Sequence, residues 1–328
     1  MPGLRRVVVP FVLLLATLSL ACGDDGGSGD GDGGDASSDA GSGDGGGDDG
    51  GDDDGDGDDG GGGDGGNEFA CRHIDLLFAV DPSGSMTEEM TAMGSEIFPA
   101  FASSLLGISQ GLDDYQVGTI DACPEPAALH SRGQGGECNF SSGEPWILGT
   151  PDREPADVTS EFSCVGDLWI EPGQSHSCNT DNDQDEQVMS ASIAALTPPF
   201  ADAENAGFLR GDAVLVVIAV TDEDEEIENG SGRTTAQQFY DDLVAVKNDP
   251  QDIVFLGIGG GVPGGCTDKP GGEYGTALPA QMLYDVSQLF VAQERGVWWD
   301  LCEGQLQDGL TAALEVIEQA CDDFGGVD

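Results

Sequence analysis

The sequence contains very little positive charge. Lys and Arg together number 10, against 63 Asp and Glu, which gives a formal net charge of −53. From residue 69 onward there are still 46 acidic and 8 basic residues. A field of this sign repels phosphate backbones, so we expect no nucleic-acid partner and favour cations or basic partners. Adaptation to a salty medium would explain the same balance equally well.

Histidines and long apolar runs are also scarce. The 3 His lie far apart in the sequence, and their spacing does not match a zinc site. The one extended apolar run covers 7–20 and follows Arg5 and Arg6. It is too short to span a bilayer comfortably, and a basic start followed by such a run is typical of a secretory signal. No other stretch predicts a transmembrane helix.

The end of this run resembles a lipobox. Residues 18–22 read LSLAC, with Ser19 where Leu is usual. We therefore expect 1–21 to be a lipoprotein signal peptide and Cys22 to be lipidated, so that the lipid is the only contact with a membrane. Gly23 does not mark inner-membrane retention, which favours the outer membrane or the cell surface. The alternative is an ordinary signal peptide, with Cys22 a spare thiol.

A Gly-rich and Asp-rich tract follows the signal. Residues 23–66 are almost entirely Gly, Asp, Ser and Ala, and such side chains bury too little apolar surface to offset the entropy of ordering. We expect 22–68 to be a disordered tether, with a root-mean-square span of about 35–40 Å before charge repulsion is added.

From Glu68 the composition becomes globular, and one domain is expected over 69–328. Apolar runs predict strands near 74–80, 115–120, 213–220, 253–258 and 297–299. Apolar residues at helical spacing predict helices from near 86, 188, 236, 282 and 306, with a kink or break at Pro99. This alternation implies an α/β fold with a doubly wound, mainly parallel sheet flanked by helices.

The cysteines indicate an oxidising compartment. Beyond Cys22 there are eight, an even number, which in an exported chain predicts four disulfides whose pairing the count alone leaves open. Four of them fall in 122–184, a region rich in Gly, Pro and Ser that we interpret as an insertion pinned by two disulfides. These four are Cys123, Cys138, Cys164 and Cys178.

Two of the predicted strands end in loops rich in oxygen donors. Asp81, Ser83 and Ser85 follow the first strand, and Asp222 follows the strongest one. Ligands of doubly wound sheets bind beyond the carboxyl ends of strands. Hard oxygen donors suit Mg²⁺ best here, with Ca²⁺ or Mn²⁺ possible. The rest of the acidic run 222–226 is interpreted as a solvated loop, with a second cation as the alternative.

Residues 74–86 (IDLLFAVDPSGSM) and 213–222 (AVLVVIAVTD) resemble the first strand and metal-ion-dependent adhesion site of von Willebrand factor A (VWA) domains. The resemblance covers roughly 71–321, with 122–184 atypical. It implies metal ligation by Asp81, Ser83, Ser85 and Asp222. The family also uses a Thr before a middle helix, for which Thr180 is the nearest candidate although no clean motif surrounds it.

The resemblance also bears on disulfides and function. Some VWA domains join their termini through a disulfide, which implies Cys71–Cys321 here, and we expect Cys266–Cys302 as the next pair. The implied function is metal-dependent binding of a protein partner that offers an acidic side chain, without catalysis. A metal-independent scaffold of the same fold is the alternative. An exported hydrolase is disfavoured, because the G-x-S-x-G pattern at 107–111 follows a helix, not a strand.

Overall fold

The structure is a computed structural model that describes residues 71–108, 112–166, 168, 186–227, 232–266 and 276–324. All of these lie in the compact unit Gly63–Asp328. The expected signal peptide, lipidation site and tether fall outside the described residues, as do Thr180 and Cys178. Within the described ranges, no helix is both long and apolar enough to cross a membrane.

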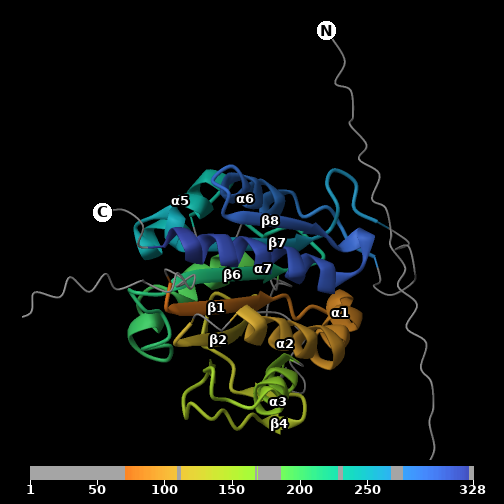
Figure 1. The fold of residues 1–328 in the computed structure, drawn as a ribbon. Helices are drawn as coiled ribbons and strands as arrows, with labels where there is room; N and C mark the ends of the chain where they lie inside the picture. The colour runs from red at the N-terminus through yellow and green to blue at the C-terminus, as the bar shows by residue number, and fades with distance from the viewer. Residues whose placement is uncertain are drawn as a thin grey trace, which may run out of the picture. The chain divides into compact units, whose positions relative to one another are not determined.

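A six-stranded sheet forms the centre of this unit (Figure 1). Its strand order is β5-β2-β1-β6-β7-β8, and every neighbouring pair is parallel except β2 with β5. The strands are β1 (His73–Val80), β2 (Asp114–Asp121), β5 (Ile147–Gly149), β6 (Val214–Val220), β7 (Ile253–Gly259) and β8 (Gly296–Asp300). The expected α/β fold with a doubly wound, mainly parallel sheet is confirmed.

The direction of winding reverses between β1 and β6. The chain goes from β1 outward to β2 on one side, and β6, β7 and β8 follow on the other. β1 and β6 pair in register from Ile74 with Val214 to Val80 with Val220. Both strands therefore end side by side at the switch point, where doubly wound sheets bind ligands.

Apolar side chains alternate between the two faces of the sheet and bury both of them. In β1, Ile74, Leu76, Phe78 and Val80 belong to one core, and Leu77 and Ala79 to the other. The first core packs beneath α1 (Thr87–Ala92), α2 (Phe98–Ile108), α3 (Pro155–Gly166) and α7 (Leu306–Asp323). The second is covered by α4 (Val188–Ala195), α5 (Ala236–Lys247) and α6 (Gln281–Val291).

The irregularity expected at Pro99 lies just before that residue. A π turn, η2 (Met93–Ile97), joins α1 to α2, and the Phe98 N–H donates to the Met93 carbonyl. Pro99 has no N–H, and its ring would clash with a carbonyl of the preceding turn in a regular α-helix. The wider turn accommodates the ring, so the helical path continues to Ile108.

The described part of the insertion contains more regular structure than its composition predicts. It contains a short hairpin of β3 (Arg132–Gly133) and β4 (Gly136–Glu137), and β5 joins the main sheet. A helix not predicted from the sequence, α3, buries Val158, Phe162 and Val165. Leu168 forms an isolated bridge with Gly133 of this hairpin.

Three disulfides are resolved between described residues. Cys71–Cys321 joins the start and the end of the domain across 250 residues. Cys266–Cys302 ties the loop after β7 to the residues after β8. Both are the pairs named from the sequence, and Cys138–Cys164 lies within the insertion as expected. Cys123 is disulfide-bonded as well.

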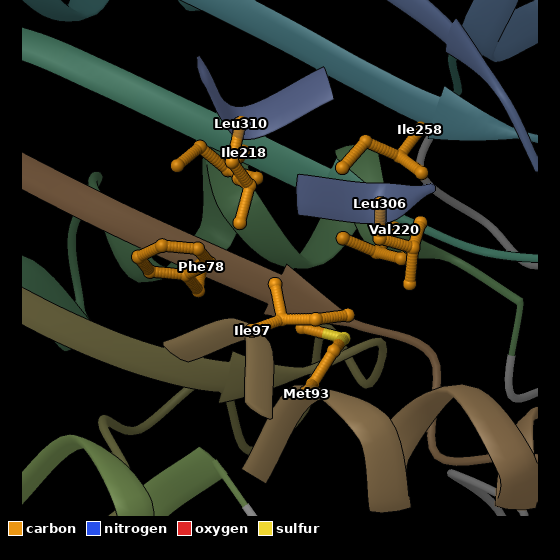
Figure 2. A pocket seen from close by; sticks show the side chains of 8 residues that line it. All are labelled: Phe78, Met93, Ile97, Ile218, Val220, Ile258, Leu306 and Leu310. Carbon is orange, nitrogen blue, oxygen red and sulfur yellow. The ribbon is translucent and has the colours of Figure 1, made fainter. Parts of the chain in front are cut away.

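A small apolar cavity lies between the sheet and the helices of the first core (Figure 2). It has a volume of about 10 Å³, at the lower limit of what one water molecule needs, and its lining offers no polar side chain. Strand residues line one side and helix residues the other. The lining consists of Phe78, Met93, Ile97, Ile218, Val220, Ile258, Leu306 and Leu310.

Candidate metal site

The loop after β1 folds back over the end of β6. The Asp81 N–H donates to the Val220 carbonyl at 2.9 Å, which extends the pairing of the two strands by one residue. The Ser83 N–H then donates to Asp81 Oδ1 at 2.7 Å, and the Met86 N–H donates to the Ser83 carbonyl at 3.1 Å. These bonds hold the loop in a tight turn that leads into η1 (Gly84–Met86).

The turn places two hydroxyls beside a carboxylate from the distant loop. Ser83 Oγ lies 2.8 Å from Ser85 Oγ. Ser85 Oγ donates to Asp222 Oδ1 at 3.1 Å, although 137 residues separate them. Ser83 and Asp222 are buried, whereas Ser85 is exposed. The buried residues Ser83 and Asp222 therefore hold the cluster in place, and solvent reaches it at Ser85.

Asp81 supplies the second carboxylate and is fully buried. Its Oδ2 accepts a hydrogen bond from Thr221 Oγ1 at 2.7 Å. The pKa of Asp81 is raised to about 7, mainly by burial and to a smaller extent by the nearby Asp222, while hydrogen bonds from Ser83 and Thr221 oppose the shift. Two carboxyls so close together favour a bound proton or a cation between them.

The donors fit a hard divalent cation. Asp81, Ser83, Ser85 and Asp222 offer only oxygen, the donor type that Mg²⁺, Mn²⁺ and Ca²⁺ prefer. Among the described residues, no group of three or more His, Cys, Asp or Glu side chains is arranged to hold a metal. A cation here would therefore depend on the two hydroxyls as much as on the two carboxylates.

The structure thus brings together the four candidate ligands predicted from two separate motifs, Asp81, Ser83, Ser85 and Asp222. The fifth candidate, Thr180, lies outside the described residues. Thr221, which was not predicted as a site residue, holds Asp81 in place through its hydroxyl. Its position directly after an apolar strand and directly before Asp222 was the available signal.

The acidic run after β6 is not simply the solvated loop that the sequence suggested. Glu225 is 5% exposed and accepts the N–H groups of Met189 and Ser190 at 3.0 and 2.9 Å, at the start of α4. Asp224 accepts the Met282 N–H at 2.7 Å, at the start of α6. Carboxylates suit these positions, because the first N–H groups of a helix lack partners within the helix. The run therefore anchors two helices next to Asp222.

Comparisons with known proteins assign no family. No family model and no curated protein matches the chain. Among solved structures it is similar to proximal thread matrix protein 1 of the mussel byssus, with 12% identity and a TM-score of 0.40, over 76% of this chain and 49% of that one. It is also similar to the adhesive tip pilin GBS104 of Group B Streptococcus agalactiae, with 13% identity and a TM-score of 0.21, over 56% and 35%. The chain thus spans about half and a third of those two chains, and likeness of this degree carries no argument about function.

Proposed function

We propose that this chain is a VWA-type binding protein of the cell envelope that uses a divalent cation to hold a protein partner. The observation that carries the proposal is the contact between Ser85 Oγ and Asp222 Oδ1, which joins the two motifs at the switch point of the sheet. In the proposal, the lipid on Cys22 anchors the chain and the tract 22–68 extends the domain from the membrane.

In this function Asp81, Ser83 and Ser85 would hold the cation, and Asp222 would ligate it directly or through water. The bound cation would supply an electrophilic position that a carboxylate of the partner completes. The protein residues keep the hydroxyls oriented and leave the Ser85 side open. No nucleophile and base are required, so we propose binding without catalysis.

A metal-independent scaffold is the second candidate, and one observation favours it. Both carboxyl oxygens of Asp81 already accept hydrogen bonds within the protein, from the Ser83 N–H and the Thr221 hydroxyl. The loop can therefore keep its shape through these bonds alone. The two candidates differ in whether Mg²⁺ changes any property of the domain.

Calorimetric titration of the full chain with MgCl₂ tests the proposal. Because the Asp residues of 24–64 also attract cations, the comparison is between variants that keep this tract. Ser85→Ala should remove one saturable Mg²⁺ site per chain. Ser103→Ala is the matched control, since Ser103 is exposed on α2 and its hydroxyl only donates to the Pro99 carbonyl. Identical titrations of wild type and both variants would contradict the proposal.

A further inference from the structure

Positive charge is unevenly distributed over the two edges of the sheet. The structure describes seven Lys and Arg residues. Four of them lie at the amino ends of the strands: Arg72, Arg210, Lys247 and Arg295. Arg72 precedes β1 and pairs with Asp113, and Arg295 precedes β8 and pairs with Asp323. This edge lies opposite the candidate metal site.

The other two cations of this edge are bound still more firmly. The Arg210 side chain contacts Asp75 and Asp114, at the starts of β1 and β2. Lys247 Nζ donates to the carbonyls of Arg210 and Ala213 at 2.6 Å each, just before β6. These cations therefore cannot reach the carboxyl ends of the strands.

The three remaining described cations lie elsewhere. Two of the remaining described cations, Arg132 and Arg153, pair with Glu137 and Glu161 inside the insertion. The last, Arg233, lies in the connection from β6 to α5 and pairs with Asp242 at 2.6 Å.

Acidic residues, by contrast, follow three strands at the carboxyl edge of the sheet. β2 ends in Asp121, which pairs with His130 at 3.2 Å. The whole of 222–226 is acidic, and Asp300 and Glu303 follow at the end of β8. A cation bound among these groups neutralises only part of the charge, so an approaching acidic surface is repelled and a basic one attracted.

We infer that the face around the candidate metal site docks a basic protein surface that presents one carboxylate among Lys or Arg residues. The inference rests on the proposed function and adds the chemistry of the partner. The single carboxylate would complete the cation, and the flanking basic groups would lie against the acidic rim formed by Asp121, Glu223, Asp224, Glu226 and Glu303. A partner with a generally acidic surface is excluded by the same charges.

Synthetic peptides supply the probe. Two peptides of equal length carry one central Glu, flanked by four Lys in one and four Ser in the other, and each has a version with Gln in place of Glu. Affinity for the full chain is measured by fluorescence anisotropy in Mg²⁺ and in EDTA. At 20 mM NaCl the Lys-flanked Glu peptide should bind at least about tenfold more tightly than the Ser-flanked one. The advantage should shrink at 0.5 M NaCl, where the Debye length is only about 4 Å.

Two charge-reversal variants test whether the Lys-flanked peptide binds at the carboxyl edge of the sheet. Glu303 is exposed at the carboxyl edge, and Glu318 is exposed near the end of α7 at the opposite edge. Both Glu303→Lys and Glu318→Lys change the charge by the same amount and leave the tract 24–64 untouched. Glu303→Lys should weaken the Lys-flanked peptide about threefold or more, and Glu318→Lys should leave it unchanged. Thermal melts of both variants check that they fold.

The outcomes separate the two claims. If the Glu and Gln versions of each peptide bind the chain with the same affinity in Mg²⁺ as well as in EDTA, the proposed function is overturned. The inferred basic partner is overturned, and the metal site stands, in two cases. In the first, affinity depends on Mg²⁺ and on the central Glu but is the same with Lys and with Ser flanks. In the second, Glu303→Lys and Glu318→Lys weaken the Lys-flanked peptide equally.

Discussion

Replacing Asp222 by Asn should have opposite consequences for stability with and without magnesium. Asn keeps the shape of the side chain and an oxygen that can accept the hydrogen bond from Ser85 Oγ. It removes one negative charge beside Asp81, whose pKa Asp222 helps to raise. Without a cation we therefore expect the free energy of unfolding to stay unchanged or to rise by up to about 1 kcal/mol.

With magnesium the order reverses. A ligand at 100 times its dissociation constant stabilises the folded state by about 2.7 kcal/mol. In a domain of this size 1 kcal/mol shifts Tm by about 2–4 °C, so the wild type should gain roughly 5–11 °C. If loss of the charged ligand weakens Mg²⁺ a hundredfold, Asp222→Asn retains about 0.4 kcal/mol, or about 1–2 °C.

Differential scanning calorimetry in MgCl₂ and in EDTA measures both effects. Asp212→Asn is the matched control, because its side chain is 76% exposed and it lies before β6, at the edge opposite the site. The reasoning is refuted if Asp222→Asn lowers the Tm of the metal-free protein by more than a few degrees. It is refuted equally if that variant keeps the full magnesium gain.

Three further predictions concern the fold. Replacing Cys71 and Cys321 together by Ala should lower the free energy of unfolding by about 2–5 kcal/mol in a denaturant titration, because the bond closes a loop of 250 residues; an unchanged midpoint would contradict this. Leu310→Ala should cost about 2–5 kcal/mol by enlarging the cavity of Figure 2, and the exposed Thr311→Ala should cost less than about 0.5 kcal/mol; equal costs would show that the cavity wall is not rigid. Burial raises the pKa of Glu225 to about 7, so the folded state holds this proton more tightly than the unfolded chain does and stability should fall as pH rises from about 4.5 to 7. Glu225→Gln should flatten this slope in melts across that pH range, and an unaltered slope would exclude Glu225 as its source.

The fold was largely readable from the sequence because its strands are fully buried. The run 213–220 has no polar residue to interrupt it, and every residue of β6 is buried as a parallel sheet covered on both faces requires. The insertion was not readable in the same way. Its α3 does carry Val158, Phe162 and Val165 at the i, i+4, i+7 spacing of a helix, with Pro155 at its start, but this short signal lies within a stretch rich in Gly, Pro and Ser and was overlooked. The partly buried Arg153–Glu161 pair is not visible in any such pattern.

The site was predictable only as two halves. A strand followed by Asp81 and another followed by Asp222 can be recognised separately, and parallel pairing then brings the ends of the two strands together. The roles of Thr221 and Glu225 depend on contacts with residues 140 and about 35 positions away. Acidic residues in a loop are predicted to be solvated. Only the tertiary structure shows that the amino ends of two helices lie against Asp224 and Glu225.

A crystal structure grown with Mn²⁺ tests the central claim most directly. The anomalous signal should show one cation bounded by Ser83 Oγ, Ser85 Oγ and Asp222, at about 2.0–2.6 Å from its oxygen ligands. Crystals of Ser85→Ala grown in the same way should lack it. An empty position in fully Mn²⁺-saturated crystals, with Ser85 Oγ still bonded to Asp222, would contradict a metal-dependent function and leave the metal-independent scaffold.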